Sequence, residues 1–393
     1  MKRNHHSDVS ILPKELKLLL KILNVENNED IIKLPKVMFS EIDWELFLKL
    51  ARHHRLYPLI YSKLNKIKIE ETLIPHNIIK ALAEEYKRNT FQMLQLSGEM
   101  EQISKLFSEK QIRLLFLKGP VIADDIYGDV SLRTSKDLDL LIAIKDLKMA
   151  EEILLNSGYE KEEEFPSISN EWQWMNHHTT YFHPHKRIQI EIHWRLHPFP
   201  TKEPSFNELW ERKRTSKLTG SPIYFLGKED LFSFLIVHGG RHGWFRLRWL
   251  VDIDYIIRQG YTPKDQSIFT IYNYSHFAGQ AFLLASQLLE TPIPVKMHSL
   301  IENTDSKRLS KLAIYYIIEM GYLHINKSQK RSIYFDRYLF SIMSNPQKVF
   351  FIIRFLYPKP NDVKTLKLPR SLHFLYFIIR PFLWGWRNLK KPI

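Results

Sequence analysis

The chain has 393 residues, of which 44% are hydrophobic and 25% charged, and its formal net charge is +14. This length exceeds that of one compact domain, and the composition is typical of a globular protein. The absence of cysteine excludes disulfides, thiolate metal sites and cysteine nucleophiles, and fits a reducing compartment such as the cytoplasm. The positive charge favours polyanionic partners: nucleotides, nucleic acid or an anionic membrane.

The first expected region, residues 1–110, is helical. Pro13 suits a first helical turn, and a second helix is expected over 41–55. Apolar residues at spacings of three, four and seven predict one long helix over 75–110.

The second expected region, residues 111–226, alternates strands and helices. The pattern predicts strands over 114–117, 137–142, 179–182 and 187–194, with helices over 121–127 and 147–156. Asp146 resembles the N-cap of the second helix, and the last two strands favour an antiparallel hairpin. A helical region over 227–330 follows, with helices over 228–238 and 244–258 separated by Gly239-Gly240. Residues 331–393 form a basic, aromatic tail.

Two carboxylates on one short strand are the strongest functional signal. Asp137 and Asp139 alternate with Leu138 and Leu140, so both acids project from one face while the leucines are buried. Converging carboxylates repel each other unless a cation lies between them, and oxygen ligands of this kind suit Mg²⁺. The pair therefore predicts a metal-dependent enzyme.

A later strand adds a third acid. In residues 188–194 isoleucines alternate with Gln189, Glu191 and His193, so Glu191 and His193 share the unburied face. If this strand lies beside the Asp137 strand, three carboxylates meet and can hold two divalent ions about 4 Å apart. We interpret His193 as a residue that supports the ligands rather than as a catalytic base.

Groups that could bind phosphates stand close by in the sequence. Lys118 and Gly119 follow the first strand directly before a helix start, which offers N–H donors and a favourable dipole. Arg133 and Ser135 precede the acidic strand and could donate to the same phosphates.

These residues resemble a known family, the uncharacterised bacterial nucleotidyltransferases of the polymerase-beta-like nucleotidyltransferase superfamily. The motifs that carry the resemblance span about residues 40–260: 117–119, Tyr127, 133–142, 190–194, 238–242 and 246–252. The resemblance implies an α+β fold, with a small mixed-sheet core flanked by N-terminal and C-terminal helical regions. It also implies that Asp137, Asp139 and Glu191 bind Mg²⁺ or Mn²⁺, and that Lys118-Gly119 replaces the superfamily's small-residue turn.

The implied reaction transfers a nucleoside monophosphate from an NTP to an acceptor, with release of pyrophosphate. The acceptor stays open between a sugar, a peptide, a protein and an RNA. One alternative is a metal-dependent glycosyltransferase that uses Asp-x-Asp to bind a sugar nucleotide. The other is a non-catalytic basic module that binds nucleic acid or membrane.

The remaining candidate residues are basic or aromatic. Arg241, Arg246 and Arg248 could reach the triphosphate or the acceptor, or form a solvated face with Asp252 as partner. His238 and His242 lack the glutamate of a helical zinc motif, and we interpret them as packing residues. The histidines between 177 and 185 lack a thiol or nearby acid to complete a zinc site, so we expect them at a turn and on the surface.

The apolar run 374–386 is interrupted by Arg380-Pro381 and is too short to span a membrane. It predicts a helix packed on the body, or an interfacial helix at the inner face of the membrane, edged by tryptophans and basic residues.

Overall fold

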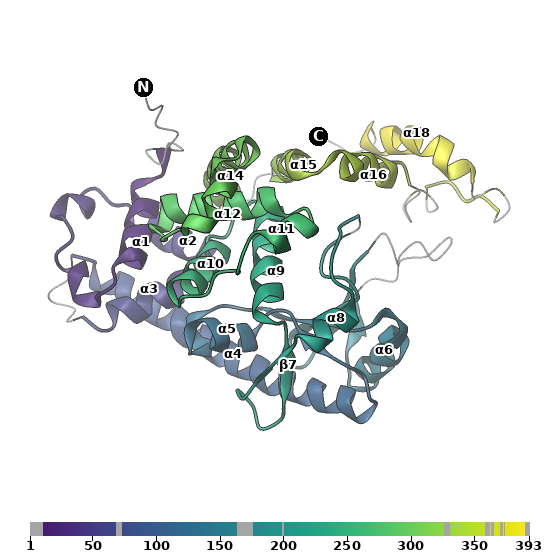
Figure 1. Ribbon diagram of the computed structural model, residues 1–393, viewed down its shortest axis with the longest axis horizontal. Coiled ribbons are helices and arrows are strands. Elements are labelled where there is room, and N and C mark those ends of the chain that lie inside the picture. Colours follow the sequence, from purple (N-terminus) through teal and green to yellow (C-terminus); the bar gives the residue numbers. More distant parts are fainter. Residues whose placement is uncertain are drawn as a thin grey trace.

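The computed structural model describes residues 11–67, 73–162, 176–198, 200–325, 331–357, 362, 365–369, 372 and 374–389. The middle of the chain forms a mixed β-sheet of seven strands. Helices precede and follow this sheet in the sequence (Figure 1). One continuous hydrophobic core joins these parts.

The N-terminal helices include the long helix that the apolar spacing predicts. The helices are α1 (Lys14–Asn24), η2 (Asn28–Ile31), η3 (Lys36–Met38), α2 (Trp44–His53), α3 (Tyr57–Leu64) and α4 (His76–Glu109). Met93, Met100 and Ile103 of α4 are buried, and α4 packs on β2 (Asp137–Leu141) and β7 (Ile223–Phe225). The expected helix over 41–55 is α2, which begins after Asp43, whose side chain accepts a bond from the Leu46 N–H. The separate helix α3 was not predicted.

The sheet brings together strands from across the predicted α/β region. Its other strands are β1 (Leu115–Phe116), β3 (Glu160–Lys161), β4 (His178–His183), β5 (Ile188–His193) and β6 (Arg214–Ser216). Their order is β3-β4-β5-β2-β1-β7-β6. The antiparallel β4–β5 hairpin is confirmed, and so is the position of β5 directly beside β2, to which it runs parallel.

Three strands were not predicted. β3, β6 and β7 have only two or three residues each, too few for an alternating pattern to be seen. β7 pairs in parallel with β1 and extends the sheet past the first strand.

Helices after β1 cover the sheet and lead away from it. They are α5 (Pro120–Tyr127), η5 (Val130–Leu132), η6 (Ile144–Asp146), α6 (Leu147–Asn156), α8 (Phe206–Glu211), α9 (Lys228–Arg241), α10 (Arg248–Arg258), α11 (Ser267–Ile271), α12 (Ser275–Leu289), η7 (Val295–Met297), α13 (His298–Glu302) and α14 (Thr304–Ile325). Asp146 stands before α6 as expected, but its side chain makes no capping bond because a 3₁₀ turn leads straight into the helix.

The expected break at Gly239-Gly240 is wrong, because α9 continues through both glycines to Arg241. A Cβ on Gly239 would lie 2.2 Å from the Trp244 ring, and one on Gly240 would lie 2.4 Å from the Phe277 ring. The glycines therefore allow close packing inside a helix. The chain leaves the helix at Gly243, which has a left-handed φ of +62°.

The last helices extend along one side of the molecule from α14 (Figure 1). They are α15 (Arg331–Ile342), α16 (Asn345–Leu356) and α18 (Leu375–Leu389), and α16 contacts α18. Among the residues that the structure describes, no helix combines the length and the apolar character needed to cross a membrane.

Candidate active site

Two carboxylates and an imidazole meet where β2 and β5 lie side by side. The parallel register sets Asp139 opposite Glu191, so their side chains share one face of the sheet. Leu138 and Leu140 alternate with these acids and are completely buried. The Asp139 side chain is also fully buried, whereas that of Glu191 is one-fifth exposed. Asp139 and Glu191 thus lie next to each other, as the sequence predicts.

His193 lies between the two acids. Its Nε2 atom is 3.3 Å from Asp139 Oδ1 and 3.3 Å from Glu191 Oε2. Burial alone would lower the pKa of His193, but the two carboxylates outweigh burial and raise it. The pKa of Glu191 shifts in the opposite direction: burial opposes its ionisation, but the interaction with His193 lowers its pKa below the usual value.

The two acids of the Asp-x-Asp pair differ in their electrostatics. Burial would raise the pKa of Asp139, but Lys118 and His193 together lower it. The pKa of Asp137 is raised, first by burial and then by the charge of Asp139. The Ser135 hydroxyl donates to the Asp137 carbonyl at 3.0 Å. Asp137 therefore accepts a proton more readily than Asp139 unless a further cation is present.

The Lys118-Gly119 turn reaches the acids as expected. Lys118 Nζ is 2.9 Å from Asp139 Oδ1. Gly119 has a φ of +92°, and a Cβ there would lie 3.3 Å from Leu138 Cδ2, so the turn requires glycine. Because α5 begins at Pro120, the turn sets a cation and a helix N-terminus beside the carboxylates.

A buried ion pair holds the loop that leads into β2. Arg133 is completely buried, with its Nε 3.0 Å from Asp252 Oδ1 and its Nη2 3.1 Å from Asp252 Oδ2. The Tyr127 hydroxyl donates to the same carboxylate at 2.7 Å. Asn89 of α4 donates to the carbonyls of Ser131 and Arg133. This geometry favours a structural role for Arg133 over the expected role in phosphate binding.

A family model described as uncharacterised nucleotidyltransferase matches residues 40–290, which is 251 of the 393 residues. The chain belongs to this nucleotidyltransferase family. It is therefore an enzyme of that class.

The solved structures contain a weak similarity to this nucleotidyltransferase. An antigenic nucleotidyltransferase-like protein from Paracoccidioides brasiliensis is 16% identical, with a TM-score of 0.33, over 53% of this chain and 97% of that chain. No curated protein matches the sequence significantly.

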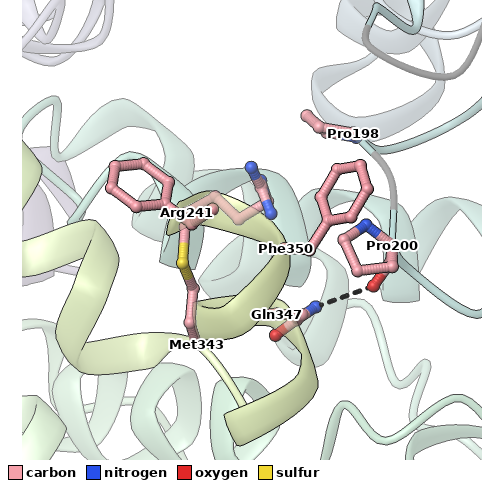
Figure 2. A pocket seen from close by; sticks show the side chains of 7 residues that line it. Pro198, Pro200, Arg241, Met343, Gln347 and Phe350 are labelled. Carbon is pink, nitrogen blue, oxygen red and sulfur yellow. Dashed lines mark hydrogen bonds between the residues drawn. The ribbon is translucent and has the colours of Figure 1, made fainter. Parts of the chain in front are cut away.

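Arg241 and Arg246, which were expected near the nucleotide, have different neighbours, although the charges of both act on His242. Arg241, at the end of α9, lines a pocket with residues of α16 and of the loop after β5, and its guanidinium points along that pocket (Figure 2). The other lining residues are Pro198, Pro200, Met343, Gln347, Phe350 and Phe351. Arg246 instead lies close enough to Arg55 and Lys136 for its charge to lower their pKa values. Asp252, the partner considered for these arginines, is bound by Arg133. Arg248 is buried and donates to the Thr134 carbonyl, so a solvated position is wrong for it.

Arg55 is a residue that the sequence did not indicate. It stands between α2 and α3 with a φ of +57°, and its charge interacts with that of Asp137. Burial, followed by Arg246, lowers the pKa of Arg55 to about 10. Cations crowded around a carboxylate in this way form an attractive site for phosphates. No signal pointed to Arg55, because the surrounding pattern is only helical.

The histidines of the β4–β5 hairpin also differ from expectation. His183 flanks the hairpin turn as expected, but the expected surface position is wrong for it, because it is buried against Tyr159. The surface position is also wrong for His177 and His178, which are half-buried beside His193. The cause is the hairpin register, which sets His178 opposite His193. The rings of His238 and His242 pack on Trp249.

The site has the properties of a cation site. Among the described residues, Asp139 Oδ2 and both ring nitrogens of His193 are buried without a hydrogen bond of standard geometry, whereas Asp139 Oδ1 has Lys118 Nζ at 2.9 Å. A buried polar atom without a hydrogen bond lowers the stability of the folded protein, so these atoms indicate that the site binds a ligand. The ligand atoms of Asp139, Glu191 and His193 lie within 4.8 Å of one another, a set that fits a divalent ion and that does not include Asp137.

Proposed function

We propose that this nucleotidyltransferase transfers a nucleoside monophosphate from an NTP to a hydroxyl or phosphate oxygen of an acceptor. The acceptor oxygen bonds to the α-phosphorus, the bond from that phosphorus to the β-phosphate bridging oxygen breaks, and pyrophosphate leaves. The observation that carries this proposal is the register of β2 and β5, which sets Asp139 opposite Glu191 beside Lys118. The same strands support kinship with the polymerase-beta-like superfamily.

Asp137, Asp139 and Glu191 are the proposed ligands of Mg²⁺ or Mn²⁺. A bound divalent ion would neutralise charge on the phosphates and lower the pKa of the attacking hydroxyl. Glu191, which is partly exposed, would accept the proton of that hydroxyl.

The triphosphate would be held by the cations around these acids. Lys118 supplies a point charge at the start of α5, and the backbone N–H groups after the Gly119 turn add donors. Arg55, Arg246 and Lys136 supply positive charge on the Asp137 side. Catalysis by these residues is positioning and charge stabilisation, and the family match favours it over sugar transfer.

Labelled nucleotides test the proposed reaction. The protein is incubated with Mg²⁺, each α-³²P-labelled NTP in turn and fractions of cell extract as acceptors, and label transfer and pyrophosphate are followed. We expect Asp137→Asn and Asp139→Asn each to reduce transfer by at least ~100-fold. Glu160→Gln, an exposed acid on the edge strand β3, is the matched control and should retain full activity. Near-normal transfer by Asp139→Asn would contradict the proposal.

We also propose that α16 and α18 contact an anionic membrane surface. Large apolar side chains on them are exposed, among them Ile353, Ile378, Phe382 and Trp386. Residues 331–393 contain twelve basic and two acidic residues, so this part carries a net charge of +10. An apolar face beside dense positive charge complements anionic lipid headgroups.

A further inference from the structure

His193 has a geometry that a supporting residue does not need. A single atom, Nε2, faces one oxygen of Asp139 and one oxygen of Glu191 at the same distance of 3.3 Å. One ring nitrogen carries either one hydrogen or one lone pair, so it can donate to only one of these oxygens at a time. Neither contact has the geometry of a hydrogen bond. A cation shared by all three atoms accounts for both contacts at once.

The distances agree with ligands around one ion. Around a tetrahedral ion with bonds of ~2.0–2.1 Å, neighbouring ligand atoms are ~3.3–3.4 Å apart. Both contacts of His193 Nε2 have this length. Two contacts of equal length from one nitrogen atom are what three ligands around a single ion would give.

His178 and His177 give an independent observation on the same face. His178 Nε2 is 3.8 Å from Glu191 Oε2, and its other nitrogen, Nδ1, is 3.2 Å from His177 Nε2. Histidine ligands commonly donate their second N–H to a neighbouring group, which fixes the tautomer and aims the free lone pair at the metal. The nitrogen atoms of His177, His178 and His193 form a second group within 4.8 Å.

We propose that His193 is a direct ligand of the ion held by Asp139 and Glu191, with His178 as an additional nitrogen donor. This inference rests on the proposed function and deepens it. Nitrogen donors favour transition-metal ions, whereas Mg²⁺ prefers oxygen ligands alone. The site therefore selects a first-row transition-metal ion, such as Mn²⁺ or Zn²⁺, over Mg²⁺.

Bound Mn²⁺ reports its own ligands by pulsed electron paramagnetic resonance. In the full-length protein we expect electron spin-echo modulation from ¹⁴N of a coordinated imidazole. In protein from cells grown on ¹⁵N-labelled histidine, ¹⁵N frequencies should replace the ¹⁴N modulation. This measurement needs no variant. His193→Gln should remove most of the signal. His185→Gln, at the exposed turn of the same hairpin, should leave it unchanged. Bound Mn²⁺ without nitrogen modulation overturns the inference.

Calorimetric titration gives the second measurement. We expect Mn²⁺ to bind at least ~10-fold more tightly than Mg²⁺. His193→Gln should weaken Mn²⁺ binding by ~10–100-fold and Mg²⁺ binding by much less. Equal affinities in the wild-type protein overturn the inference. If Asp139→Asn still abolishes transfer in that case, the proposed function stands and only the ligand assignment of His193 fails.

Discussion

At the scale of single residues, Glu203 shows how burial sets a titration. Its carboxylate accepts bonds from the N–H groups of Leu196 and His197, at 3.2 and 3.0 Å, and so closes the loop that follows β5. Burial raises the pKa of Glu203 to about 7, although Arg195 and the two N–H groups oppose that shift. The charged form of this residue is therefore disfavoured in the folded protein.

Stability should fall with rising pH because of Glu203. Between its ordinary pKa of 4.5 and about 7, the folded protein keeps a proton that the unfolded chain has lost, so the free energy of unfolding decreases by about 3 kcal/mol across this window. Glu203→Gln should remove this part of the slope. Urea unfolding of both proteins at pH 4.5, 6 and 8 measures the difference, and parallel curves would contradict the prediction.

The Arg133–Asp252 pair leads to a prediction about stability instead of substrate affinity. Arg133→Met leaves a buried carboxylate that keeps, among the described residues, the Tyr127 hydroxyl as donor, so we expect a loss of about 3–5 kcal/mol in the free energy of unfolding. Adding Asp252→Leu should recover part of the loss, because the uncompensated charge disappears. Chemical denaturation measures both effects. Weaker NTP binding at unchanged stability would instead support the phosphate-binding role.

At the scale of elements, two helical glycines should respond to alanine in opposite directions. Gly239 of α9 faces the Trp244 ring, where a Cβ would lie at 2.2 Å, so Gly239→Ala should destabilise by about 1–3 kcal/mol. Gly98 of α4 has nothing within 4 Å of a Cβ, so Gly98→Ala should stabilise by about 0.5–1 kcal/mol through helix propensity alone. Thermal unfolding compares the two variants, and stabilisation of both would show that the packing at Gly239 is dispensable.

The elements show which features could be predicted from the sequence. The apolar pattern extends over enough residues in α4, β2 and β5 to indicate both the type of element and its buried face. The break at Gly239-Gly240 failed because the reason for those glycines is Trp244 and Phe277, contacts that local sequence does not reveal. The acids of the site could be found in the same way as their strands. Arg55 and His178 could not, since only tertiary packing and strand register bring them to the site.

At the scale of the whole molecule, charge and apolar surface coincide at the C-terminal end. Phe382 and Trp386 of α18 are 76% and 57% exposed, in the part of the chain that accounts for +10 of the net charge of +14. An exposed apolar face within a basic region favours binding to a membrane, which has negative headgroups and an apolar interior.

Vesicle sedimentation should reveal this preference. We expect the protein to bind vesicles containing phosphatidylserine, to bind phosphatidylcholine vesicles weakly, and to dissociate as salt is raised. Replacing Phe382 and Trp386 with Glu should weaken binding at least ~10-fold. Phe91→Glu is the matched control, because Phe91 on α4 is 74% exposed but lies outside the basic region. Equal binding to both kinds of vesicle would contradict the proposal.

Hydrogen bonds linking α4 and α10 to the loop before β2 limit which segments of this enzyme can be exchanged independently. The candidate ligands come from residues 137–193, yet Asn89 and Asp252, far apart along the chain, fix the loop that aims the first of them. A chimera that kept the strands and exchanged their helices would inherit the acids without their alignment. Residues of α4 and α10 therefore constrain the position of the candidate ligands although they lie outside the strands that carry them.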